Sequence, residues 1–150
     1  MTLEWAGAYR HYHAPLMRTI PVGRVTDQHQ RMFDVCLESM EACQKVLRPG
    51  NAIGEVFDAY ASTCDSSGMK DHRLNAAGYS LGTTFSPNWM DWPMFYHGNT
   101  VIVEKNMVFF LHMILMDSDS RTAMCFGHTV LVTDSGCECL SRHPFELVVR

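Results

Sequence analysis

His112 is the residue whose neighbours in the sequence point most directly to chemistry. It stands inside the apolar run VFFLHMILM, residues 108–116, where side chains are expected to be buried. Burial disfavours the charged imidazolium, so the pKa of such a histidine falls and the ring is mostly neutral at pH 7. A neutral imidazole in a binding site can serve as general base or general acid. A core histidine with satisfied ring nitrogens is the alternative interpretation.

Aromatic side chains mark a second candidate region. Trp89 and Trp92 lie in the long stretch GTTFSPNWMDWPMFYHGN, residues 82–99, and a loop of that length in a compact domain usually has a function. Indole rings can stack on a quaternary ammonium group. Tyr79, just before this stretch, could donate a hydrogen bond into the same site or belong to the core. Covering the core is the alternative for at least one of the two tryptophans.

The composition describes a single domain over residues 1–150, with 47% apolar and 19% charged residues. A net charge of −4 without a cluster of Lys or Arg predicts neither a nucleic-acid nor an anionic-membrane partner. The six cysteines match no zinc template and are interpreted as free thiols. No apolar run of 18 residues and no signal-peptide pattern is present, so a cytoplasmic protein without a membrane partner is expected.

Periodicity predicts the elements that must position these residues. Segments 3–12 and 15–22 are β-like and form a hairpin, with a tight step at residues 13–15. Apolar residues at three- and four-residue spacing predict a helix over 26–47 and a second one capped by Asn51 that ends near 66–68. Residues 82–99 are expected to be irregular, and a long hairpin with a short closing strand at 137–140 follows. Helices followed by antiparallel strands predict an α+β domain.

The order of these pieces resembles the catalytic domain of the creatinase, aminopeptidase P, prolidase and methionine aminopeptidase superfamily. The resemblance covers most of residues 3–142 and rests on five stretches: YHAPLMRT, VLRPGNAIGEV, HRLNAAGYSLG, NMVFFLHM and FGHTVLVTDSGCECL. It implies the pita-bread fold, a curved antiparallel sheet with helices on its outer face. It also implies that the chain corresponds to the C-terminal portion of that domain, incomplete at the N-terminus.

The superfamily's chemistry uses two divalent metals held by two aspartates, one histidine and two glutamates. Carried over by local motif, these ligand positions are occupied here by Glu4, Pro15, Tyr79, His112 and Gly127. None keeps the ligand type of the superfamily, so no metal and no other cofactor is expected. The auxiliary histidine of such enzymes corresponds to Ser86. By the period-two rule His128 points away from the face that holds His112 and Gly127.

The candidate catalytic residues are therefore His112, Tyr79 and Glu4. Glu4 is either an ordinary edge-strand carboxylate or the counter-charge of a cationic ligand. His13, two residues before Pro15, is a candidate for substrate binding with Ser86, Trp89 and Trp92, and a solvated strand edge is the alternative for His13.

Three functions remain open from the sequence. The first is a metal-independent hydrolase of the creatinase kind, acting on or binding a small charged, nitrogen-containing or zwitterionic compound. The second is a catalytically inactive binding member or fragment. The third is an Xaa-Pro or methionyl metallopeptidase with atypical ligands. A small-molecule substrate is the expected partner, and a homodimer is a further possibility because members of the superfamily are commonly dimeric.

Overall fold

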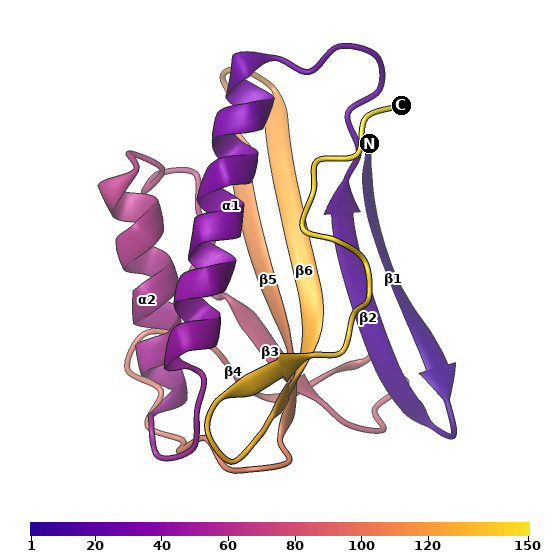
Figure 1. Ribbon diagram of the computed structural model, residues 1–150, viewed down its shortest axis with the longest axis vertical. Helices are drawn as coiled ribbons and strands as arrows, with labels where there is room; N and C mark the ends of the chain where they lie inside the picture. Colours follow the sequence, from indigo (N-terminus) through magenta and orange to yellow (C-terminus); the bar gives the residue numbers. More distant parts are fainter.

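Two helices follow one another in the first half of the computed structural model, which describes residues 1–150 (Figure 1). α1 (Asp27–Val46) begins after Thr26, whose side chain accepts a hydrogen bond from the backbone N–H of His29 over 3.3 Å. α2 (Ile53–Ser66) packs beside α1. The helix predicted over 26–47 is confirmed, because the apolar residues at helical spacing form its buried face.

The start of α2 differs from the prediction. Asn51 does not cap this helix, because its side-chain amide donates instead to the carbonyl of Val46 at the end of α1, over 2.8 Å. The N–H of Ala52 is satisfied by the carboxylate of Glu55, at 3.0 Å. Asn51 therefore closes the first helix, and an acidic side chain one turn into the second helix takes over the capping role.

All strands belong to one antiparallel sheet in the order β1-β2-β6-β5-β3-β4, with β7 paired to the edge of β6 (Figure 1). Their bounds are β1 (Thr2–Tyr9), β2 (Tyr12–Thr19), β3 (Gly78–Leu81), β4 (Met90–Met94), β5 (Val108–Asp117), β6 (Thr122–Val132) and β7 (Cys137–Cys139). The predicted β5–β6 hairpin and closing strand are confirmed.

Two predictions about strands were wrong. The turn of the first hairpin lies at Arg10 and His11, which take φ values of 49° and 72°, so the segment predicted as the turn lies inside β2. The stretch 82–99 is not irregular throughout, because β4 pairs with β3. Polar and apolar residues do not alternate regularly along β4, and Pro93 lies inside it, so the sequence of β4 did not indicate a strand.

The two faces of the sheet are covered differently. On the helix face, which α1 and α2 cover, alternate residues of β5 such as Phe109 and Leu111 enter the main core. Phe126 of β6 packs there edge-on against Phe33 of α1, with ring centroids 5.8 Å apart. The opposite face, called the open face below, carries a smaller apolar cluster of Met17, Tyr79, Phe110 and Cys125.

The sheet curls around the open face. β2 and β3 are separated by two other strands in the sheet order, yet they contact each other. In a flat sheet three inter-strand steps would place them about 14 Å apart. The curl therefore brings side chains from β1, β2 and β3 toward those of β5.

The sheet also forks between β2 and β6. These strands pair only at Met17 with Gly127 and at Arg18 with Phe126, and further along β6 the partner is β7. The carbonyl of Pro15 points toward β6, because it accepts a hydrogen bond from the Thr129 hydroxyl over 2.8 Å. The nitrogen of the same residue faces the same side and has no hydrogen to donate, so the β2–β6 ladder cannot continue through Pro15.

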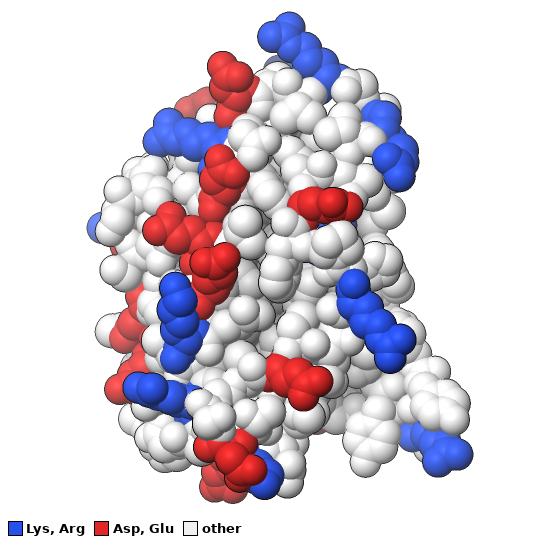
Figure 2. Space-filling view, viewed as in Figure 1, with Lys and Arg blue, Asp and Glu red and all other residues white.

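Acidic side chains gather over the helices (Figure 2). Asp34, Glu38 and Glu41 are exposed along one side of α1 at helical spacing. Lys and Arg are scattered singly or in pairs over the face shown. Neither helix is long and apolar enough to span a membrane.

Candidate functional site

One row of residues crosses the open face and contains three of the positions predicted to correspond to metal ligands of the superfamily. Glu4 is opposite Met17, Met17 is opposite Gly127, and Gly127 is opposite His112 in the registers of β1, β2, β6 and β5. Pro15 lies on the same face, opposite Ala6. The structure thus brings together positions that are more than 100 residues apart in the sequence.

Tyr79 joins this cluster through a hydrogen bond from Trp89 and through its position beside Glu4. Trp89 Nε1 donates to the Tyr79 hydroxyl oxygen over 2.9 Å. An indole N–H can only donate, so the hydroxyl hydrogen of Tyr79 remains available for the carboxylate of Glu4. Partial burial raises the pKa of Glu4, and the hydrogen bond from Tyr79 opposes this rise. Burial also raises the pKa of Tyr79 well above its ordinary value, so the phenol stays protonated as a donor.

His112 lies next to Tyr79 as a buried neutral imidazole. Its side chain is among the buried polar groups, and its ring centroid is 5.7 Å from that of Tyr79 and 6.0 Å from that of Phe110. Burial lowers its pKa to about 4, and Nδ1 is buried without a hydrogen-bond partner. His112 is therefore neutral at pH 7 and a weak base.

His13 links the hairpin to the aromatic stretch. Its ring lies 4.5 Å from that of Phe85, in an edge-to-face arrangement, and 6.3 Å from that of Trp89. Its Nδ1 is buried without a partner. His13 therefore joins the same region of the open face as Glu4, Tyr79 and Trp89.

The remaining two candidates lie further out. Ser86 is exposed in the segment between β3 and β4, and no side-chain hydrogen bond ties it to the cluster. Trp92 is 61% exposed and packs against Tyr96, with ring centroids 5.8 Å apart, rather than against the cluster.

His128 lies on the helix face, as the register requires. It is paired opposite Leu111, whereas Gly127 is opposite His112. Burial lowers its pKa to about 3, and its ring lies between the Arg18 guanidinium on Nε2 and Cys139 Sγ on Nδ1. His128 belongs to a buried polar cluster behind the site.

Sequence analysis missed three residues that shape the site. Phe110 and Met17 lie on the open face, and the period-two pattern of β5 already placed Phe110 on the same face as His112. Arg18 is only 8% exposed and donates from Nη1 to the carbonyls of Met17 and Gly127, at 2.7 and 3.1 Å. It ties β2 to β6 where the two strands pair, and no sequence signal predicted that role.

The side chains at this site do not fit the dinuclear metal centre of the superfamily. A Cβ added to Gly127 would lie 2.4 Å from Cζ of Phe110, so the ring fills the space of a ligand side chain at that position. Pro15 offers no side-chain donor. Around Glu4 and His112, as elsewhere in the chain, no three His, Cys, Asp or Glu side chains are grouped as metal ligands. The donor set is too small for the centre.

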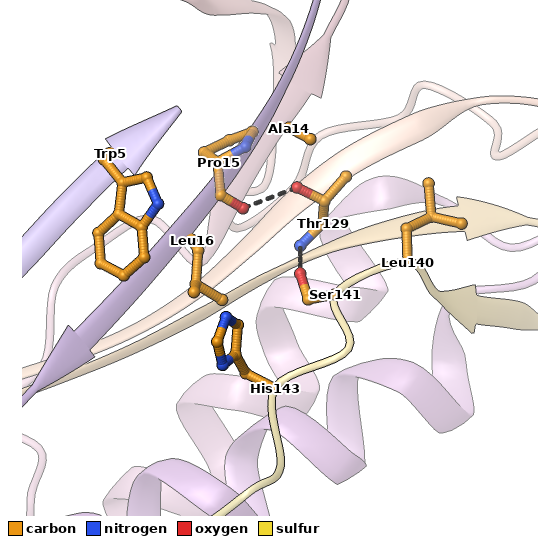
Figure 3. Close-up of a pocket in the computed structure, with 8 residues that line it drawn as sticks. All are labelled: Trp5, Ala14, Pro15, Leu16, Thr129, Leu140, Ser141 and His143. Carbon is orange, nitrogen blue, oxygen red and sulfur yellow. Dashed lines mark hydrogen bonds between the residues drawn. The ribbon is translucent and has the colours of Figure 1, made fainter. Parts of the chain in front are cut away.

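The cavities of the structure lie beside this cluster. A cavity of about 210 Å³ on the helix side of the fork is lined by Trp5, Leu16 and His143, among others, and contains none of the candidate site residues (Figure 3). A larger one, of about 520 Å³, includes His13 in its wall. Neither is lined by Glu4, Tyr79 or His112, because the apolar cluster around Phe110 and Met17 fills the centre of the open face.

Comparison with known proteins identifies a family and a fold. The sequence profile of metallopeptidase family M24 matches residues 1–134. Ectoine hydrolase from Halomonas elongata is 31% identical over 148 residues, which cover 98% of this chain and 36% of that protein. Dipeptidase PepE from Mycobacterium ulcerans superposes with a TM-score of 0.90 at 19% identity, over 99% of this chain and 39% of that one.

The Xaa-Pro dipeptidase from Bacillus anthracis superposes with a TM-score of 0.91 at 18% identity, over 99% of this chain and 41% of that one. Identities this low show the fold alone. The predicted pita-bread architecture, with a curved antiparallel sheet and helices on one face, is confirmed. The chain spans between about a third and two fifths of the length of these three proteins.

Proposed function

This chain belongs to metallopeptidase family M24 and is similar in sequence to a hydrolase, and we propose that it acts without a metal on a small cationic or zwitterionic nitrogen compound. The observation that carries the proposal is the hydrogen bond from Trp89 to Tyr79, whose hydroxyl faces the carboxylate of Glu4. Glu4 thus presents one carboxylate, and the indole of Trp89 lies beside Tyr79. This part of the sheet contains the positions predicted to have lost the metal ligands of the superfamily. A carboxylate flanked by aromatic rings is suited to a cation.

The side chains have distinct roles in the proposed reaction. Glu4 pairs with the positive charge of the substrate and accepts a proton from the water that attacks the carbon of its C–N bond. The same proton passes to the leaving nitrogen as that bond breaks. Tyr79 orients Glu4, and the neutral ring of His112 hydrogen bonds to the reacting group, since its low pKa keeps it uncharged at pH 7.

The relatives support the chemical class. The similarity to ectoine hydrolase extends over almost the whole chain and favours a small osmolyte such as an ectoine derivative as substrate. The proposal concerns this portion of the fold, since the relatives are longer. Residues outside the matched region of a longer protein would complete the site.

A second candidate is a binding member without catalysis. It is favoured by the packing around His112, where Phe110 and Met17 fill the space in which the imidazole would meet a reacting group. A metallopeptidase with atypical ligands is the third candidate, and the family name and the Xaa-Pro dipeptidase fold favour it. The substituted donor positions argue against it.

Two measurements separate these candidates. Elemental analysis of protein purified without chelator, before and after soaking in Mn²⁺ and Co²⁺, should find far less than one metal per chain. Thermal unfolding with betaine, creatine and ectoine derivatives should raise Tm for at least one compound, because a ligand of the native state stabilises it by mass action. The shift should disappear in Glu4→Gln. Stoichiometric metal would sink the metal-independent proposal.

Turnover then distinguishes the first two candidates. Release of an amine or carboxylate product from the compound that raises Tm supports the hydrolase. A bound compound that stays intact supports the binding member. Retained turnover in His112→Ala would remove His112 from the reaction.

A further inference from the structure

The largest cavity of the molecule lies next to the candidate site. This fork cavity, of about 520 Å³, lies between the tip of the β1–β2 hairpin, the end of β3 and the start of β5. Its wall contains no Asp, Glu, Lys or Arg. The lining residues are Tyr9, Tyr12, His13, Ala14, Ser80, Leu81, Gly82, Asn106, Met107, Val108, Thr129 and Leu140.

The cavity has a cause in the sequence. Because Pro15 has no N–H to offer β6, the β2–β6 ladder ends at Met17, and the two strands separate beyond that point. Thr129 and Leu140, at the separation, line the fork cavity together with the tip of β2. The proline ends the β2–β6 ladder and β7 takes the edge of β6 beyond it, so the fork cavity lies where β2 and β6 part.

Two contacts connect the fork cavity to the cluster around Glu4. His13, in the cavity wall, packs against Trp89, whose indole donates to Tyr79 beside Glu4. Leu81, also in the wall, packs against the apolar cluster that includes Tyr79 and Phe110. A ligand in the cavity is therefore next to the aromatic residues of the site.

The chemistry of the wall restricts the occupant. An uncharged, mostly apolar wall excludes a charged group and favours a ring or alkyl chain. Cavities of about 150 Å³ already hold benzene, so the fork cavity has room for a substituent of one or more rings.

We propose that the fork cavity binds the apolar substituent of an organic cation whose nitrogen lies at Glu4. This inference rests on the proposed function and adds to it that the ligand is larger than a compact zwitterion. Tetramethylammonium and benzyltrimethylammonium carry the same head group, and only the second has a ring for the cavity.

Calorimetric titration of the protein with both cations tests the inference. Benzyltrimethylammonium should bind roughly tenfold to a hundredfold more tightly, because its ring leaves water for an apolar cavity. Val108→Trp fills the cavity and should abolish that advantage while leaving tetramethylammonium binding unchanged. Leu140→Trp, at a rim position that is 43% exposed, should act in the same direction without threatening the fold. Ile102→Trp, exposed and away from the cavity, is the matched control.

The outcomes separate this inference from the function on which it rests. Equal affinity for both cations, lost in Glu4→Gln, would overturn the cavity assignment and leave the cationic site standing. No binding of either cation, or binding that Glu4→Gln does not change, would overturn both. An equal loss of affinity for both cations in Val108→Trp and Leu140→Trp would also overturn the cavity assignment. The loss would then not depend on the benzyl ring of the ligand.

Discussion

The indole of Trp89 and the hydroxyl of Tyr79 are joined by a 2.9 Å hydrogen bond in which the indole is the donor. The direction is unambiguous because an indole N–H cannot accept. It leaves the phenolic hydrogen free to face Glu4, so Trp89, in the segment between β3 and β4, acts on the carboxylate through Tyr79. The protonation of Glu4 therefore depends on residues 75 or more positions away.

Tyr79→Phe should raise the pKa of Glu4. The hydrogen bond from Tyr79 lowers that pKa and burial raises it, so only the burial effect remains in the variant. The folded pKa of Glu4 lies above its unfolded pKa, so Glu4 stabilises the folded protein below its unfolded pKa. This contribution to the free energy of unfolding is lost as pH rises through the folded pKa. The pH window of that loss should move upward. Carbon-13 NMR titration of the glutamate carboxyls measures it, with the exposed Tyr96→Phe as control.

His112 should make the fold sensitive to acid. Its folded pKa of about 4 lies below the unfolded value of 6.5, so the unfolded chain binds the proton more tightly. Stability is full above pH 6.5 and falls by about 3 kcal/mol as pH drops to 4. His112→Leu should flatten this slope in urea unfolding series, whereas His97→Gln, at an exposed position, should not. An unchanged slope in the leucine variant would contradict the assignment.

Gly127→Ala should destabilise the protein by about 1–3 kcal/mol. The added Cβ meets the ring of Phe110 at 2.4 Å, inside a packed cluster. Gly136→Ala is the matched control, because nothing lies within 4 Å of its Cβ. Truncating the ring in Phe110→Ala should make the second change at Gly127 nearly neutral, so the double variant should be less than additive in urea unfolding. Full additivity would mean that the ring does not limit this position.

Arg18→Met should cost about 2–4 kcal/mol in urea unfolding. The change removes the donors of the Met17 and Gly127 carbonyls and the partner of His128 in a buried cluster. Arg18→Lys keeps the charge but cannot reach all three acceptors at once, so an intermediate loss is expected. Arg48→Met, at an exposed position after α1, should stay within about 0.5 kcal/mol. An equal loss at both arginines would count against the tie between β2 and β6.

The sequence by itself determined the elements with a strong period. Helical spacing located α1 almost to the residue, and the period of two placed His112 and His128 on opposite faces, because both patterns are local properties of the backbone. Local motifs also predicted that Pro15 and Gly127 stand at metal-ligand positions of the superfamily, and this correspondence stays a prediction. The predictions for the turn of the first hairpin and for β4 were wrong. The positive φ values of Arg10 and His11 and the pairing of β4 with β3 have no strong signal in the local sequence.

Only the tertiary structure decided which residues meet. The curl of the sheet places Tyr79 against Glu4, and the register of four strands aligns Glu4 with His112, while Trp92 and Ser86 remain outside. The fork cavity likewise follows from what a single proline does to a ladder between strands more than 100 residues apart. These relationships depend on contacts between distant segments, and the spacing of residues along the chain does not encode the distance between strands that fold side by side.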